Sequence, residues 1–188
     1  MAIARRVGFG KKIILGDKSI KNCETIAKIM TDAGFDVEPF EMDLSSRESI
    51  KAMIAKAQEF GEIKYMVNGA GVSPSQAPIE AILRVDLYGT AVLLEEVGKV
   101  IAEGGAGVTI SSQSGWRMPQ LTPEQDRQLA TTPTEELLSL ECGCRHGKNV
   151  SCFKQESQNS RLAETHNLHT DQQLLSGSLC GSLLIARL

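Results

Sequence analysis

The chain has 188 residues, 41% hydrophobic and 4% aromatic, so it can form one domain with a largely aliphatic core. A formal net charge of −3, without a cluster of lysines and arginines, argues against a nucleic-acid-binding protein. No apolar run reaches the roughly 18 residues that cross a bilayer, and the basic residues 1–6 are not followed by a signal-peptide core. We therefore expect a cytoplasmic protein with reduced thiols and neither a membrane nor a nucleic-acid partner.

The chain begins with a helical pattern over residues 2–7, which Gly8-Phe9-Gly10 is placed to end. Residues 13–15 then form a short apolar run that is typical of a buried strand. Ser19 can cap the helix that follows, and Gly34 stands where that helix should end. Apolar residues recur along this helix at the spacing of a single face, at Cys23, Ile26, Ala27 and Met30.

The next segments repeat this alternation of strand and helix. Residues 35–42 predict a strand. Ser45-Ser46-Arg47-Glu48 matches the S-x-x-E capping box, which places Ser45 at the start of a helix. Apolar residues lie on one face of that helix as far as Phe60, and residues 63–67 predict a further strand.

A long, mostly apolar helical pattern runs from Pro78 to Glu103, and residues 107–111 predict another strand. Strands that alternate with helices of this length form parallel βαβ units, in which helices cover both faces of the sheet. The sequence therefore predicts an α/β fold with a doubly wound parallel sheet.

The character of the sequence changes near residue 141. All six prolines and every tyrosine and tryptophan precede this point, whereas all three histidines and four of the five cysteines follow it. Residues 1–141 have a net charge of −5, and residues 142–188 have a net charge of +2. We interpret residues 141–188 as an irregular or disordered tail not selected for the preceding fold, produced by a shifted reading frame or by a short divergent domain.

Asp17 directly follows the first predicted strand. In a dinucleotide-binding fold, an acidic residue here accepts hydrogen bonds from the adenosine ribose and repels a 2′-phosphate, which favours NAD over NADP. An ordinary turn aspartate is the alternative. The glycine-rich phosphate loop belongs about 20 residues earlier, before Met1, so we expect the first strand and this loop to be missing.

Four motifs resemble those of the short-chain dehydrogenase/reductase family. Val67 to Gly71 is similar to its N-N-A-G motif, and Asp43-Leu44 is similar to its adenine-contacting pair. Thr109 to Gly115 resembles the strand end that carries the catalytic serine, and Val85 to Gly89 occupies the place of the V-N-x-x-G motif. Because the four occur in the family's order, residues 1–140 resemble a member truncated at its N-terminus and divergent or frame-shifted after about residue 141.

The resemblance implies a Rossmann-like, partial NAD(P)-binding domain over residues 1–140 that acts on an alcohol or ketone substrate. It implies Ser112 as the catalytic serine, with Ser114 as the alternative, and places Asp86 where the family has an asparagine. The region 78–103 corresponds to one that the family often uses for homo-oligomer contacts. The implied cofactor contacts are Asp17, Asp43, Leu44, Asn68, Gly69, Ala70 and Gly71.

Structural interpretations stay open for these positions. Asn68 to Gly71 could form a plain turn, Ser111 to Ser114 could be a polar loop, and Asp86 could cap or pair on a helix surface. Cys142, Cys144 and His146 do not have the spacing of a standard zinc framework, so we expect no metal site.

The family's catalytic pair is absent from the sequence. A tyrosine acts there as general acid/base, and a lysine four residues later lowers its pKa from about 10. Tyr65 and Tyr88 are the only tyrosines; Gly69 and Val92 stand four residues beyond them, and both tyrosines precede Ser112. We therefore expect a catalytically impaired oxidoreductase. The alternatives are a non-catalytic remnant that binds nucleotide or oligomerises, and a product with no stable fold.

Overall fold

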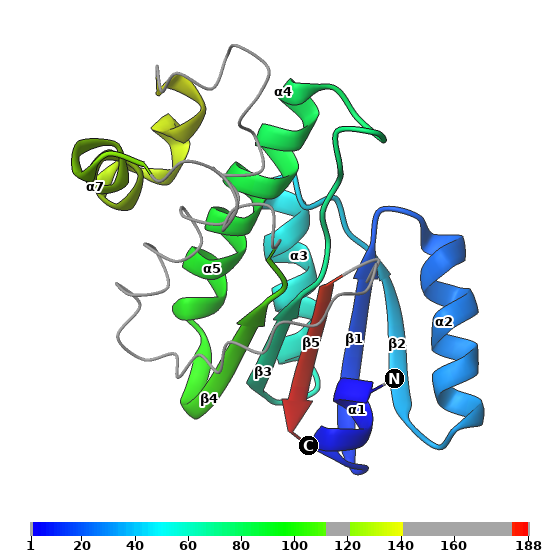
Figure 1. The fold of residues 1–188 in the computed structure, drawn as a ribbon. Helices are drawn as coiled ribbons and strands as arrows, with labels where there is room; N and C mark the ends of the chain where they lie inside the picture. Colours follow the sequence, from blue (N-terminus) through cyan, green and yellow to red (C-terminus); the bar gives the residue numbers. More distant parts are fainter. Residues whose placement is uncertain (1, 112–120, 141–181, 188) are drawn as a thin grey trace.

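The computed structural model describes residues 2–111, 121–140 and 182–187. Five strands form one sheet in the order β2-β1-β5-β3-β4 (Figure 1). The strands are β1 Lys11–Asp17, β2 Asp36–Glu41, β3 Glu62–Asn68, β4 Ile101–Thr109 and β5 Ser182–Arg187. The helices are α1 Ala2–Val7, α2 Ile20–Asp32, α3 Arg47–Gln58, α4 Ile79–Ile82, the π-helix η1 Leu83–Gly89, α5 Thr90–Gly98, α7 Pro123–Thr131 and the 3₁₀-helix η2 Thr134–Ser139.

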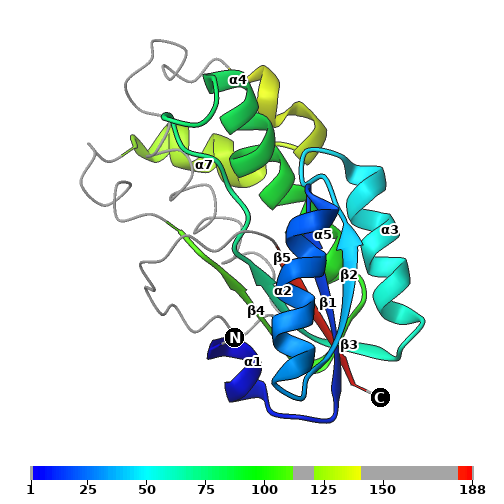
Figure 2. The ribbon, with the colours of Figure 1, turned by 90° about the vertical axis from the view of Figure 1, so that its right-hand side faces the viewer.

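The predicted doubly wound α/β architecture is confirmed. Ile13 and Ile14 are neighbours on β1, so their side chains point to opposite faces of the sheet, and both are buried. Ile13 packs with Met30 of α2 and with Ala4 of α1, whereas Ile14 packs with the apolar residues of α3 and α5. Figure 2 shows α1 and α3 on opposite sides of the sheet.

The central strand of the sheet comes from the far end of the chain. β1 pairs with β2 and β3 pairs with β4 in parallel, as the alternation of strands and helices predicts. Between these two pairs lies β5, which is antiparallel to both β1 and β3. Strand β5 was not predicted; because it pairs on both sides, the inner edges of β1 and β3 are not left open.

Most helix ends follow the predicted signals. The Ser19 hydroxyl accepts a hydrogen bond from the Asn22 amide, and Gly34 ends α2 with a φ of 89°. The capping-box assignment is wrong by one residue. Ser46 caps α3 by accepting a hydrogen bond from the Ser49 amide. Ser45 is held in the preceding turn, because its amide and its hydroxyl both donate hydrogen bonds to the Asp43 carboxylate.

The predicted helix from Pro78 to Glu103 was too long, and the following strand was placed too late. The helical region ends at Gly98, and β4 covers Ile101–Thr109, because pairing with β3 extends it backwards. A register shift, with Gly104 at a φ of 71°, accommodates extra residues in β4. The middle of the helical region is the π-helix η1. Helices of this type are rare in proteins, and those that occur often lie at functional sites.

Residues 121–140 pack on the outer side of η1 and α5. Leu129 of α7 and Leu137 of η2 are almost fully buried against Leu87 and Ala91. No helix in the described part of the chain is long and apolar enough to cross a membrane.

Gly89 provides a test of the packing between η1 and the turn after β2. A Cβ at this position would overlap the carbonyl oxygen of Leu44 and lie 2.9 Å from its carbonyl carbon, which belongs to backbone and cannot rotate away. We expect Gly89→Ala to lower the free energy of unfolding by about 1–3 kcal/mol, measured by urea denaturation.

Gly98 is the matched control because it also lies in a helix, and a Cβ there meets nothing within 4 Å. Gly98→Ala should leave stability unchanged or raise it by up to about 1 kcal/mol. Equal effects of the two substitutions would contradict the packing of η1 on the Leu44 carbonyl.

Candidate functional site

The ends of the strands form a row across one edge of the sheet. Gly16 pairs with Phe40 on one side and with Ser182 on the other, and Ser182 also pairs with Asn68. Asn68 in turn pairs with Thr109. Adjacent strands lie about 4.8 Å apart, so β1 and β3 are separated by about 10 Å at this row. The predicted cofactor residues of β1 and β3 therefore lie along a single edge.

Asp17 is the last residue of β1 at this edge. Its carboxylate Oδ1 accepts a hydrogen bond from the Ser19 amide at 2.8 Å, which positions the side chain beside the N-terminus of α2. Among the described residues, no hydrogen bond to the second oxygen, Oδ2, is present. Asp17 is half-buried, so the carboxylate is both turn-forming and accessible to a polar ligand.

The Asp43-Leu44 turn follows β2 at the same edge. The Asp43 carboxylate accepts hydrogen bonds from Ser45, and its Oδ2 forms an ion pair with Lys18 at 2.8 Å. Burial raises the pKa of Asp43, but the hydrogen bonds from Lys18 and Ser45 outweigh it and hold the pKa below the ordinary value. The Leu44 side chain is buried in the core, so only its backbone can face a ligand.

Asn68 is buried at the end of β3 and organises the loop that follows it. Its side-chain amide donates to the Thr90 hydroxyl at 3.1 Å, and its Oδ1 accepts from the Ala70 amide at 3.2 Å. Its backbone carbonyl accepts from the Ile110 amide at 2.8 Å. The loop Gly69-Ala70-Gly71 is thereby fixed to β3, to α5 and to the end of β4. The partner Thr90 was not predicted, because it lies 22 residues further along the chain and no local pattern connects it to Asn68.

Asp86 is not a surface residue, so the interpretation of a surface cap or pair is wrong. It is 2% exposed within η1, and its Oδ1 accepts a hydrogen bond from the Val72 amide at 3.0 Å. Asp86 therefore holds the far end of the same loop that Asn68 fixes at its start. The predicted catalytic residues Ser112 and Ser114 lie outside the described residues; Ser111, two residues beyond β4, is half-buried.

Strand β5 determines what the centre of this edge can bind. A dinucleotide-binding sheet has the usual order 3-2-1-4-5, and its first strand leaves the edge through a glycine turn into a helix whose N-terminus holds the diphosphate. Here β5 occupies that central place but runs the other way, so it begins at this edge with Ser182. The chain enters the sheet at this point, and no helix N-terminus can follow β5 here. The described residues therefore provide no helix N-terminus after the central strand that could hold a diphosphate.

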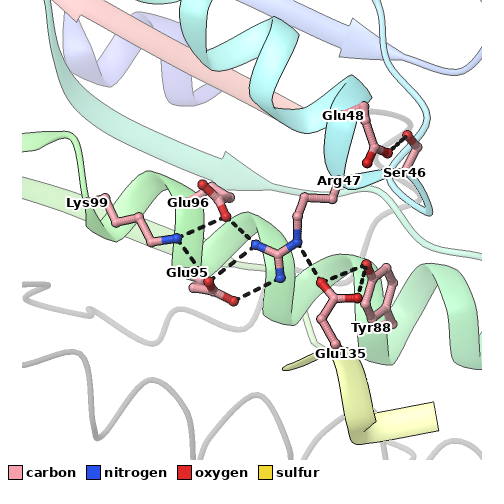
Figure 3. Close-up of polar contacts among 8 residues, drawn as sticks. All are labelled: Ser46, Arg47, Glu48, Tyr88, Glu95, Glu96, Lys99 and Glu135. Atoms are coloured by element: carbon pink, nitrogen blue, oxygen red, sulfur yellow. Dashed lines mark hydrogen bonds and ion pairs between the residues drawn. The ribbon is translucent and has the colours of Figure 1, made fainter. Parts of the chain in front are cut away.

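A network of charged residues fixes α3 against α5 and η2 (Figure 3). Arg47, at the start of α3, contacts Glu95 and Glu96 of α5 and donates to Glu135 of η2 at 2.7 Å. Lys99 also binds Glu95 and Glu96, at 2.9 and 3.0 Å. Hydrogen bonds from Arg47, Lys99 and Thr134 lower the pKa of Glu95 to about 2, with Arg47 contributing most and burial opposing. Only the helical spacing of Glu95 and Lys99 hints at this network in the sequence, and that signal is weak.

Neither tyrosine is arranged as a general base. The Tyr88 hydroxyl donates to the Glu135 carboxylate, with O–O distances of 3.1 and 3.3 Å (Figure 3). Burial and this carboxylate raise the pKa of Tyr88, which is opposite to what a catalytic tyrosine needs at neutral pH. Tyr65 packs with the cluster around Ile13 and Phe35. No group of three His, Cys, Asp or Glu side chains within residues 2–111, 121–140 and 182–187 could hold a metal ion.

Comparisons with known proteins identify the family. Residues 2–122 match the family model described as short chain dehydrogenase. The chain belongs to the short-chain dehydrogenase/reductase family. Short-chain dehydrogenase/reductase bsc3 of Alternaria brassicicola is 39% identical to it over 140 residues, which is 74% of this chain and 51% of that protein. D-threitol dehydrogenase of Mycolicibacterium smegmatis is 30% identical over 114 residues, which is 56% of this chain and 44% of that protein.

Solved structures agree with this assignment at the level of the fold. A short-chain dehydrogenase/reductase from Serratia marcescens has a TM-score of 0.50 at 22% identity, covering 56% of this chain and 47% of its own. A family member from Brucella melitensis has a TM-score of 0.51 at 20% identity, covering 56% and 48%. The chain spans about half the length of the short-chain dehydrogenase/reductases that it matches.

The depressed pKa of Glu95 predicts how the network responds to acid. A carboxyl whose folded pKa lies below its ordinary 4.5 contributes stability that is complete above about pH 5 and is lost as the pH falls toward 2. We expect Glu95→Gln to be less stable than the parent chain at pH 7 and the difference to shrink between pH 5 and pH 2. Urea denaturation across this range measures it, with the exposed Glu80→Gln as the control. Parallel stability curves for the parent chain and Glu95→Gln would contradict the network.

Proposed function

We propose that the carboxyl edge of β1, β2 and β3 binds the adenosine part of NAD. The observation that carries this proposal is the position of Asp17, Asp43 and Asn68, each at or just beyond a parallel strand end on one edge of the sheet. In dinucleotide-binding sheets the ligand lies outside the carboxyl ends of the strands. The implied substrate of the ancestral enzyme is an alcohol or ketone.

The preference for NAD over NADP rests on the charges around the ribose position. The Ser19 amide holds one carboxylate oxygen of Asp17, and the other, which has no hydrogen bond within the described part of the chain, is placed to accept one from a ribose hydroxyl. A 2′-phosphate at the same place would meet this negative charge. Lys18 is the nearest cation in sequence, and its ammonium group is paired with Asp43. NAD is therefore the proposed ligand and NADP the weaker one.

We further propose that these 188 residues bind nucleotide without transferring hydride. Three features support this: the absence of Tyr-x-x-x-Lys, the raised pKa of Tyr88 and the reversed direction of β5 at the diphosphate position. A non-catalytic nucleotide-binding protein is accordingly the function that the site supports best.

Asp17→Asn tests the ribose contact. Asparagine keeps the acceptor for the Ser19 amide but removes the charge, so the fold should persist. We expect NADH affinity, measured by cofactor fluorescence, to fall about tenfold because a charge-assisted hydrogen bond is lost, and NADPH affinity to stay equal or to rise.

Asp36→Asn is the matched control, since Asp36 begins β2 at the opposite edge of the sheet. It should leave both affinities unchanged. Equal loss of NADH binding in the two variants, or no NADH binding by the parent chain, would refute the adenosine site.

Hydride transfer is tested separately by NADH production with a panel of secondary alcohols. We expect no rate above background because the sequence has no Tyr-x-x-x-Lys pair to take the alcohol proton near neutral pH. Turnover of about 1 s⁻¹ or faster, the ordinary range for enzymes, would refute the proposed loss of catalysis without affecting the binding proposal.

A further inference from the structure

The strands that form the candidate site do not all run the same way. β1, β2 and β3 end at this edge of the sheet, and Asp17 and Asn68 are the last residues of β1 and β3. β5 lies between β1 and β3 and begins at the same edge with Ser182 (Figure 1). A dinucleotide laid along the edge from β2 to β3 would therefore cross three strand ends and, between β1 and β3, one strand start.

The strand start stands where a dinucleotide-binding sheet holds the diphosphate. In such a sheet the diphosphate binds the turn after the central strand and the N-terminus of the helix that follows. Both features belong to a strand that ends at the edge, so β5 cannot supply them. The central position therefore contributes a pairing partner for β1 and β3, but no helix N-terminus for a phosphate.

The helix N-termini that follow β1 and β2 are already matched by carboxylates of the chain. At α2, the Asp17 carboxylate accepts a hydrogen bond from the Ser19 amide at 2.8 Å, and the Ser19 hydroxyl accepts one from the Asn22 amide. At α3, the Ser46 hydroxyl caps the helix and donates to Glu48 in its first turn at 3.1 Å. The partial positive charge of a helix N-terminus attracts anions, but an acidic side chain that already stands there repels a phosphate.

The carboxylate of Asp17 suits a ribose better than a phosphate. Its Oδ2 has no hydrogen bond within the described part of the chain, and the residue is half-buried. The neighbouring Lys18 pairs with Asp43 at 2.8 Å and so does not neutralise Asp17. A ribose hydroxyl can donate a hydrogen bond to Oδ2, whereas the ionised oxygens of a diphosphate can only accept hydrogen bonds and would meet a like charge.

We propose that this edge is a nucleoside site, which binds unphosphorylated adenosine about as tightly as it binds NAD. It rests on the proposed function of the same residues, and it narrows the recognised group from a dinucleotide to adenosine itself. AMP, ADP and NAD then bind through that group, and their phosphates add nothing to the affinity. Any compound that presents adenosine with free ribose hydroxyls is a ligand of this class.

Isothermal titration calorimetry on the 188-residue chain with adenosine, AMP, ADP and NADH tests the nucleoside site. We expect no phosphorylated ligand to bind more than about fivefold more tightly than adenosine, because no phosphate contact adds to the free energy of binding. A cradle with two charge-assisted hydrogen bonds to the diphosphate would instead make NADH bind about a hundredfold more tightly than adenosine, or better. Adenosine should also displace bound NADH.

The ribose contact is tested with 2′-deoxyadenosine, which lacks one hydroxyl donor. It should bind the parent chain about tenfold more weakly than adenosine, because a hydrogen bond to a charged group is lost. This difference should shrink in Asp17→Asn, since the hydrogen bond to a neutral amide is weaker. In Asp36→Asn, at the opposite edge of the sheet, the full difference should persist.

Ionic strength gives an independent readout, because salt weakens contacts between phosphates and cationic side chains. We expect the dissociation constant of NADH to change less than about twofold between about 20 and about 500 mM KCl. A larger loss of NADH affinity in salt would overturn the nucleoside site.

The ligand series separates the nucleoside site from the proposed function on which it rests. NADH binding that is tighter than adenosine binding by more than the expected margin would overturn the nucleoside site alone and leave an NAD site standing. A 2′-hydroxyl effect that Asp17→Asn fully retains would also overturn it, because adenosine would then bind elsewhere. Absence of binding for all four ligands would overturn both.

Discussion

The pairing of β5 with both β1 and β3 is the interaction on which the rest of this structure depends. Without it, the described strands would form two separate parallel pairs, β2-β1 and β3-β4, each with an open inner edge. Unpaired backbone groups on such an edge are costly when buried and promote aggregation when exposed. The same strand sets the distance between the candidate site residues Asp17 and Asn68. Gly16, next to Asp17, and Asn68 both pair with Ser182 of β5.

Local signals in the sequence predicted much of the fold. Ser19, Gly34 and the alternation of apolar segments act over a few residues, and the structure confirms them. The misplaced features depend on distant partners. Residues 182–187 form a strand by pairing between β1 and β3, and the start of β4 is set by its pairing with β3. Ser46 instead of Ser45 caps α3, because Ser45 is hydrogen-bonded to Asp43.

The candidate site divides in the same way. Asp17, Asp43 and Asn68 could be named from motifs because each stands at or just beyond the end of a strand, and parallel strands bring their ends to one edge. The buried positions of Asp86 and Thr90 could not be predicted from motifs, because they result from the approach of η1 and α5 to the loop after β3. Gly89 allows that approach by letting η1 touch the Leu44 carbonyl, and Arg47 holds α3 and α5 together beside it.

Strand direction separates what the central strand does for the fold from what it does for a ligand. Backbone hydrogen bonds can be supplied by a strand of either direction, so an antiparallel β5 completes the sheet. Diphosphate binding requires more, namely a strand that ends at the edge and continues into a helix N-terminus. A segment that begins at that edge cannot meet this requirement whatever its side chains. The sheet can therefore be completed without a helix N-terminus at its centre, since the first depends on backbone pairing alone and the second on the direction of the central strand.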